Sequence, residues 1–195
     1  MNKGKKTALI QMLVIAALYI AITVIEDLTV GMTKDVIQVR ISEALTVLPY
    51  FTPAAIPGLF IGCLVSNYII LPKTYSIMSV ATYNAYTYDV IFGSLATLVG
   101  AIGTYAIRKY KFLAPLPPIV VNMFAVPLLF TYAYRFEDGS FWYYVATIGI
   151  GEAIACGVLG IALMLGLEDH KDKLFPSGVK KDTGTETEKE DKTGE

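Results

Sequence analysis

The sequence predicts an all-α, polytopic membrane protein whose chain crosses the bilayer six times. Hydrophobic residues make up 54% of the 195-residue chain and charged residues only 17%, whereas soluble domains carry about a quarter charged residues. The charges are also unevenly distributed, with eighteen Lys, Arg, Asp and Glu in residues 1–167 and fifteen in the last 28. The first 167 residues therefore have too few charges to coat a soluble surface. This excludes a soluble globular domain, a disordered chain and a nucleic-acid-binding protein, which needs a basic face.

Six apolar stretches are long enough, or nearly so, to cross the membrane. A transmembrane helix needs about 20 mostly apolar residues. The stretches do not alternate apolar and polar residues with a period of two, so helices are favoured over strands. The predicted spans are 7–25, 39–51, 54–71, 89–107, 117–134 and 141–167.

Charges and prolines mark the boundaries of the first three spans. The first span follows three lysines and ends at Glu26 and Asp27, which mark the membrane boundary. It is interpreted as a retained helix, because no small-residue cleavage site with a soluble mature domain follows it. The second span is short and opens with Arg40 and Glu43, and the third lies between two prolines.

The last three spans have ends typical of membrane helices. The fourth starts at Asp89 and ends before Arg108 and Lys109. The fifth starts at Pro117, and the sixth opens with four aromatic residues at 141–144. Aromatic residues of this kind are enriched at membrane interfaces.

The distribution of Lys and Arg predicts the orientation. Six spans place both termini on one side, and cytoplasmic loops carry an excess of basic residues. The side with the termini holds eight basic residues next to the helix ends, and the other side holds four. We therefore expect a plasma-membrane protein with both termini in the cytoplasm. The eight are Lys3, Lys5, Lys6, Arg108, Lys109, Lys111, Lys171 and Lys173, and the four are Lys34, Arg40, Lys73 and Arg135.

The predicted domain organisation is one six-helix membrane domain over 1–170, followed by a disordered, charged cytoplasmic tail over 171–195. The tail prediction rests on composition, because residues 176–195 are rich in Gly, Thr, Glu and Lys and almost free of apolar side chains. Such segments cannot bury enough apolar surface to fold.

Six polar side chains lie within the apolar spans or at their ends. Polar groups in a span are costly, and they usually face the bundle interior, a cavity or a partner. Most of the six fall in the outer half of the membrane on the predicted topology, so we expect a polar ligand pocket that opens outward. The candidate binding residues are Arg40, Glu43, Asn67, Asp89, Asn122 and Glu152.

Several of these residues also have a purely structural interpretation. Arg40 and Glu43 are three apart, on one helical face, and could form an ion pair. Asp89 could be the N-cap of the fourth helix. Glu152 is flanked by small residues that offer it no partner, so its interpretation is either a ligand contact or a pair with Arg40 or Arg135.

Aromatic residues gather at the predicted outer interface. They are interpreted either as an interfacial belt or as rings that stack on a flat ligand, with Tyr75 to Tyr88 forming a lid. The others lie at the end of the fifth span and at the start of the sixth, and they are Tyr132, Tyr134, Phe136, Phe141, Trp142, Tyr143 and Tyr144.

The chain carries no recognisable catalytic or nucleotide-binding motif. It lacks a nucleophile elbow, a zinc-protease motif and a phosphate-binding P-loop. One His and the two cysteines Cys63 and Cys156, both in apolar segments, cannot build a zinc site. We therefore expect neither an enzyme nor a resident metal or cofactor, and any ATP-driven step would need another subunit.

Three motifs carry a resemblance to a known family. They are QVRISEALTVLP at 38–49, IPGLFIGCLVSN at 56–67 and DVIFGSLATLVGA at 89–101. Together they resemble the queuosine-precursor transporter family, whose members are substrate-binding S components of energy-coupling-factor transporters. The likeness covers about residues 5–170.

The resemblance implies a six-helix S-component fold and a set of partners. These are a transmembrane coupling protein and two ATPase subunits, which would use the ATP, so this chain needs no cofactor of its own. Alanines spaced like Ala17 and Ala21 on the first helix form the docking face in many S components. Their four-residue spacing lets backbones approach closely in lipid.

The ligand that the resemblance implies is a queuosine precursor, the 7-deazaguanine base with an aminomethyl group. Carboxylates accept the donor pair at the edge of such a base, and a second acid can pair with the ammonium group. Glu152 and Asp89 are expected to take these two roles in an order that stays open, with Glu43 as a third candidate. Asn67 or Asn122 could meet the carbonyl, while Arg40 would orient Glu43.

Two other functions compete with this one. The first is an S component for a different vitamin-like ligand. The second is an intramembrane enzyme or a channel that acts alone, for which Glu152 and Asp89 are the only plausible catalytic pair. Activity of the purified single chain would favour the second.

Overall fold

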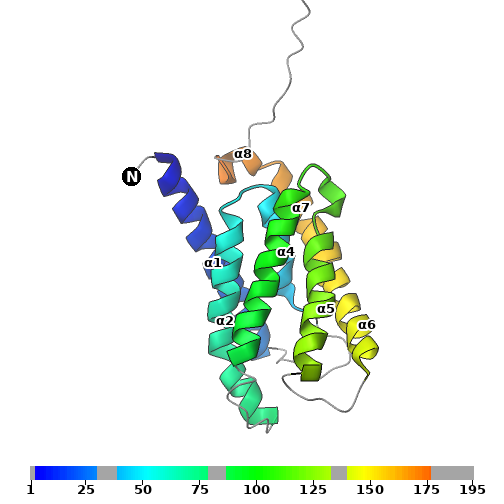
Figure 1. Ribbon diagram of the computed structural model, residues 1–195. Coiled ribbons are helices and arrows are strands. Elements are labelled where there is room, and N and C mark those ends of the chain that lie inside the picture. The colour runs from blue at the N-terminus through cyan, green and yellow to red at the C-terminus, as the bar shows by residue number, and fades with distance from the viewer. Residues whose placement is uncertain (1–2, 30–38, 79–86, 133–139, 177–195) are drawn as a thin grey trace, which may run out of the picture.

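The fold is a bundle of helices that run side by side along one long axis (Figure 1). The computed structural model describes residues 3–29, 39–78, 87–132 and 140–176, apart from the side chains of 71–78 and of Asp89. Every element of this described part is helical, which confirms the predicted fold class. The long elements are α1 (Lys3–Thr29), α2 (Ala55–Met78), α4 (Ser94–Ala106), α5 (Leu116–Tyr132), α6 (Phe141–Glu152) and α7 (Gly160–Glu168).

Shorter helical elements interrupt or join these helices. Two of them are π-helical turns, η2 (Asp89–Gly93) directly before α4 and η4 (Ala153–Leu159) between α6 and α7. α6, η4 and α7 thus form one continuous apolar helix over Phe141–Glu168. The remaining elements are η1 (Ile41–Tyr50), η3 (Lys111–Leu113) and α8 (Lys171–Leu174).

Each predicted span contains a helical element, but the second has a different geometry from the one expected. η1 is a 3₁₀ helix with Pro49 inside it. Ten residues at about 2.0 Å rise per residue extend about 20 Å, less than the hydrocarbon core of about 30 Å. Among the described residues, three helices are long and apolar enough to cross a membrane, and two shorter apolar helices accompany them. The expectation that the chain crosses the membrane six times stays a prediction.

η1 lies in the middle of the bundle. All eight residues from Ser42 to Pro49 are buried, because η1 packs against α1, α2, α4, η4 and α7. The apolar core forms around it and includes Val47, Leu59 and Met164. The shortest span is therefore the most enclosed one, which places its polar side chains in the protein interior.

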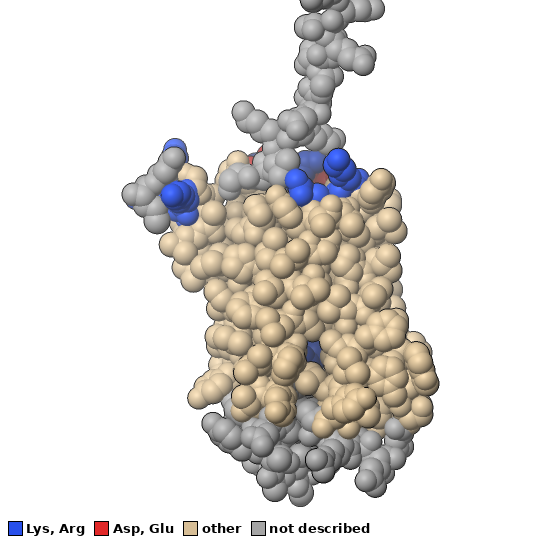
Figure 2. Space-filling view, in the orientation of Figure 1, with Lys and Arg blue, Asp and Glu red and all other residues tan. Residues whose placement is uncertain are grey.

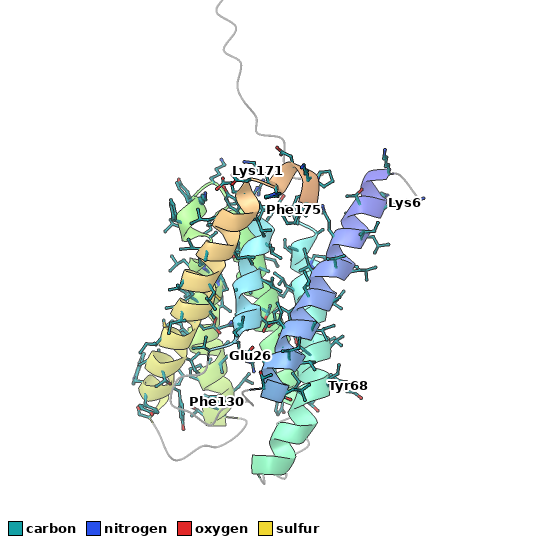
Figure 3. All side chains as sticks on the ribbon, turned by 180° about the vertical axis from the view of Figure 1, so that it is seen from behind. Lys6, Glu26, Tyr68, Phe130, Lys171 and Phe175 are labelled. Carbon is teal, nitrogen blue, oxygen red and sulfur yellow. The ribbon has the colours of Figure 1, made fainter. Side chains whose placement is uncertain are left out.

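The exposed lysines of the described residues gather at one end of the bundle. The first turn of α1 and the helix α8 lie at the same end (Figure 1). Lys and Arg side chains gather there, above a body that is almost free of charge on the visible face (Figure 2). Lys6 and Lys171 mark this basic end, and Glu26 lies toward the other end (Figure 3). A body whose visible face is almost free of charge is what contact with lipid requires.

The packed chain extends beyond the predicted domain boundary at 170. Residues 171–176, expected to begin the tail, include α8 and an aromatic anchor. The ring of Phe175 stacks on Phe51 with 5.2 Å between centroids, and Gln11 Nε2 donates to the Leu174 carbonyl at 3.1 Å. The charged composition of residues 171–173 favoured a tail, whereas the ring at 175 and the backbone at 174 contact the bundle. The rest of the predicted tail, 177–195, lies outside the described residues.

Close packing of α1 on α2 depends on Gly62. A Cβ atom added there would lie 2.8 Å from Tyr19 Cβ and 3.2 Å from the Ala16 carbonyl oxygen, whereas one added at Gly166 meets nothing within 4 Å. We expect Gly62→Ala to lower the free energy of unfolding by about 1–3 kcal/mol, because the helices must separate. Thermal unfolding in detergent, with Gly166→Ala as the matched control, measures this. Equal midpoints for the two variants would show that the α1–α2 contact is looser than the structure indicates.

Candidate functional site

Two acidic side chains from distant parts of the chain meet inside the bundle. Glu43 lies on η1 and is 2% exposed, and Glu152 is the last residue of α6 and is 7% exposed. A carboxylate oxygen of each, together with Cys156 Sγ, lies within 4.8 Å of the other two atoms. Burying two carboxyl groups this deep in an apolar bundle costs free energy unless they are hydrogen-bonded or paired. Ionisable residues in such a place usually mark a functional site. We call Glu43, Glu152, Cys156 and Asn122 the carboxylate cluster.

Both carboxylate oxygens of Glu152 have donors. Asn122 Nδ2 on α5 donates to Oε1 at 3.1 Å, and Cys156 Sγ, one turn further along, donates to Oε2 at 3.2 Å. The helix changes to π geometry immediately after Glu152, and such π-bulges are frequent at functional sites. Glu152 is thus held from two sides, by two neutral side chains.

One carboxylate oxygen of Glu43 accepts a hydrogen bond, and the other has no donor among the described residues. The Tyr19 hydroxyl on α1 donates to Oε1 at 2.5 Å. Oε2 is buried and has no hydrogen-bond partner among the described residues, and the same holds for the buried Ser42 Oγ next to it. A buried acceptor without a donor carries a desolvation cost of about 1–3 kcal/mol or more. An arriving donor at Oε2 would remove this cost.

Arg40 and Glu26 lie at the start of η1. Arg40 is half-buried and lies close enough to Glu43 and Glu26 to interact with both electrostatically. The ion pair with Glu43 expected from the sequence stays a prediction. Both carboxylate oxygens of Glu26 accept the Ile41 backbone N–H at 3.1 Å. Glu26 therefore holds the start of η1, in addition to its predicted place at the end of the first helix.

The structure brings together some of the predicted site residues and not others. The carboxylate cluster contains Glu43, Asn122 and Glu152. Arg40 lies close enough to interact with Glu43 electrostatically. Asn67 is buried, and its Nδ2 donates to Cys63 Sγ on its own helix at 3.4 Å. The same sulfur accepts from Thr97 Oγ1 on α4 at 3.3 Å. The side chain of Asp89 lies outside the described residues. Its backbone is not an N-cap, because the helix already includes residues 87 and 88.

Sequence reasoning missed Tyr19 and Cys156. Cys156 lies in an apolar segment, where a cysteine resembles any other small core residue, and a tyrosine in an apolar span resembles any other core aromatic. One signal was available for Tyr19. Gln11, Tyr19 and Thr23 lie on one face of α1, since they are spaced by multiples of four residues, and all three are buried. A polar stripe within an apolar helix points to the interior of a bundle.

An apolar groove lies between residues in and just before η2 and the C-terminal half of α5, the helix that also carries Asn122. It has a volume of about 530 Å³ and is lined by Tyr88, Phe92, Ala125, Leu128, Leu129 and Tyr132. Ala125 and Leu129 follow Asn122 by three and seven residues, so they lie on the same face of α5. An opening in the apolar surface between α4 and α5 shows a Lys or Arg side chain inside (Figure 2).

Some of the aromatic residues lie where the stacking interpretation places them, and others lie where the interfacial-belt interpretation does. Tyr88 and Tyr132 line the groove, as stacking residues would. Trp142 and Tyr143 are 68% and 45% exposed, as an interfacial belt requires. The side chains of 75–86 and the residues 134 and 136 lie outside the described residues, and the predicted lid with them.

Two further features bear on the chemistry. Ala17 and Ala21 are exposed on α1 among apolar residues, on the face opposite Tyr19.

The oxygens of Glu43 and Glu152 and the Cys156 sulfur are also atoms of the types that bind divalent transition metals. The sequence-based prediction of no metal site stays a prediction.

Comparison with known proteins adds a family to this geometry. The model of a family described as QueT transporter matches residues 9–169. The chain is also similar to a curated protein from Lactococcus lactis subsp. cremoris (strain MG1363), named queuosine precursor transporter QueT. The two are 31% identical over 113 residues, which cover 57% of this chain and 57% of the relative. The match thus spans little more than half the relative's length. No solved structure matches.

Proposed function

Because the chain belongs to the QueT transporter family, we propose that it binds a queuosine precursor in the membrane and acts as the substrate-binding S component of an energy-coupling-factor transporter. The precursor we propose is 7-deazaguanine with an aminomethyl group. The observation that carries the proposal is the carboxylate cluster, with one buried Glu43 oxygen that has no donor in the described part of the chain. A ligand with several donors and a positive charge is the complement of such a site.

The chemistry of this base suits the two carboxyl groups. The base presents an exocyclic amine beside a ring N–H, a pair of donors that one carboxylate accepts well, as Glu and Asp do at nucleic-acid base edges. Its aminomethyl group is cationic and forms a strong charge-assisted bond with the other carboxylate. We assign these roles to Glu43 and Glu152, whose carboxyl groups lie together in the carboxylate cluster, while the role expected for Asp89 from the sequence stays a prediction. The order of the two roles stays open.

The remaining contacts follow from the surroundings. Asn122 uses one amide N–H on Glu152 and has a second one for the base carbonyl. The groove lined by Tyr88 and Tyr132 can guide a planar ring by stacking. Arg40 offsets one negative charge near Glu43, and a cationic ligand offsets a second.

The S-component role explains how a chain with this interior could take part in uptake. Apolar side chains, among them Val47, Leu48 and Met164, fill the core around η1. Moving a polar base through such a core requires a rearrangement that must be driven. The sequence has no nucleotide-binding motif, so we propose a transmembrane coupling protein and two ATPase subunits as the source of energy. Ala17 and Ala21 would be the docking face.

The basic end would face the cytoplasm. Lys3, Lys5, Lys6 and the basic residues of 108–111 and 171–173 lie at this end, and the positive-inside rule assigns such an end to the cytoplasmic side. The plasma membrane is the expected location for an uptake system. The groove lined by Tyr88 and Tyr132 then lies in the outer half, from which a substrate would arrive.

Ligand-induced thermal stabilisation of the detergent-purified chain tests the proposed function. A ligand that binds only the folded protein at a thousandfold excess over Kd adds about 4 kcal/mol to its stability. We expect a large shift with the aminomethyl deazaguanine and none with guanine. A shift with a different vitamin instead would keep the S-component role and reject the substrate. No shift with any compound would contradict ligand binding by this chain.

A further inference from the structure

Three polar side chains on the buried face of α1 hold η1 along its length. Glu26 accepts the N–H of Ile41, the first residue of η1. Tyr19 donates to Glu43 near the start of η1. Gln11 Oε1 accepts from Thr52 Oγ1 at 2.9 Å, two residues beyond the end of η1. In an interior that is otherwise mostly apolar, these bonds fix η1 against α1.

Tyr19 is the one of the three that reaches the carboxylate cluster. Its side chain is 1% exposed, and α2 closes in on it at Gly62, where an added Cβ would lie 2.8 Å from Tyr19 Cβ. A ring packed this closely cannot change position without a shift of the helices. The place of the phenol oxygen is therefore set by α1 and α2, not by η1.

The bond from Tyr19 decides which Glu43 oxygen is open. Both oxygens of Glu152 already accept a hydrogen bond, and Tyr19 occupies Oε1 of Glu43. The remaining carboxylate oxygen of the carboxylate cluster is Glu43 Oε2, which has no donor among the described residues. Because a carboxylate is planar, holding Oε1 also fixes the direction of Oε2.

We propose that Tyr19 is a positioning residue of the binding site, which directs Glu43 Oε2 toward the ligand's ammonium group and makes this direction depend on the position of α1. The proposal rests on the proposed function and commits Glu43 to the ammonium group. Ala17 and Ala21 lie on the opposite face of the same helix. A partner that displaces α1 there would withdraw the phenol and weaken the hold on the ligand, as release requires.

The test is a double-mutant cycle with Tyr19→Phe, Glu43→Gln and both changes together. The affinity of each purified protein is measured for the aminomethyl deazaguanine and for 7-deazaguanine without the aminomethyl group. We expect Tyr19→Phe to raise Kd for the aminomethyl base about tenfold or more, the size expected for one hydrogen bond to a charged group, with a much smaller change for 7-deazaguanine. In the Glu43→Gln background, Tyr19→Phe should have no further effect. Tyr110→Phe, an exposed position, is the matched control.

The selectivity between the two bases separates positioning from a structural role. Equal losses for both bases, with effects of the two changes that simply add, would overturn the proposal, since a loosened bundle weakens every ligand alike. Should Tyr19→Phe not fold, Gly62→Ala displaces the same ring without removing the phenol, and it should lower the same selectivity. Unchanged selectivity in that variant also counts against the proposal.

Failure of the proposed function gives a different result. A wild-type protein that binds neither base rejects the transported ligand, whatever Tyr19 does. The midpoints of thermal unfolding of the same four proteins without ligand then decide the role of Tyr19. Non-additive effects would keep Tyr19 as the residue that positions Glu43, and additive effects would overturn it.

Discussion

Replacing Glu152 with Gln should abolish most of the affinity for the aminomethyl deazaguanine while leaving the fold intact. Truncating one partner of a buried, hydrogen-bonded charge pair costs about 2–5 kcal/mol, which corresponds to a roughly 30- to 5,000-fold rise in Kd. The fold should survive because Gln has the same shape and its amide oxygen can still accept from Asn122, which donates to Glu152 in the wild type. Direct ligand titration of the purified chain measures the change.

Asp169→Asn is the matched control for this variant. It also converts a carboxylate to an amide, but at an exposed position at the basic end of α7. It should bind ligand with wild-type affinity. Wild-type affinity in the Glu152→Gln protein as well would remove the carboxylate cluster from the binding site and leave the groove beside Tyr88 and Tyr132 as the remaining candidate.

Replacing Ala17 and Ala21 with Trp should prevent assembly with the coupling protein and the ATPase subunits. Small residues four apart allow the close helix approach that association in lipid depends on, and an indole ring at either position would hold a partner helix away. Both alanines lie on the exposed face of α1, so the fold of this chain should tolerate the larger side chain. Co-purification with tagged coupling subunits measures assembly, and transport in reconstituted vesicles should fall in parallel.

Ligand binding by the isolated Ala17→Trp/Ala21→Trp chain distinguishes a docking defect from a folding defect. We expect its Kd to stay at the wild-type value, because the change is on the face of α1 opposite Tyr19. Val99→Trp places the same side chain on α4, at a position that is 53% exposed, and should assemble normally. Normal assembly of the double Trp variant would mean that another surface carries the docking.

The site shows how an apolar bundle can hold several polar groups. Each is held by a neighbour on a different helix, so that Asn122 of α5 serves Glu152 of α6 and Tyr19 of α1 serves Glu43 of η1. Bonds of this kind satisfy most of the buried atoms and leave Glu43 Oε2 open among the described residues. Removing one member therefore changes the environment of the others, and the effects of single variants within the carboxylate cluster should not add.

The sequence by itself determined the fold class, the approximate limits of the helices and the family. These properties follow from local composition, because about 20 apolar residues between charges or prolines can do little else in a membrane than form a helix. It also identified Glu43, Asn122 and Glu152 as unusual, since any polar residue in such a stretch stands out. The three motifs at 38–49, 56–67 and 89–101 led to the family that the comparison then showed.

Only the tertiary structure decided which of these residues act together. That Glu152 meets Glu43 depends on the rotation and depth of each helix, which side-chain packing sets and no local pattern records. The 3₁₀ geometry of η1, the π turn after Glu152 and the anchor at Phe175 have the same origin, because each depends on the helices around it. Tyr19 is the clearest case: in the sequence it is one aromatic residue in an apolar span, and the contact with Glu43 that gives it a role exists only once α1 lies against η1.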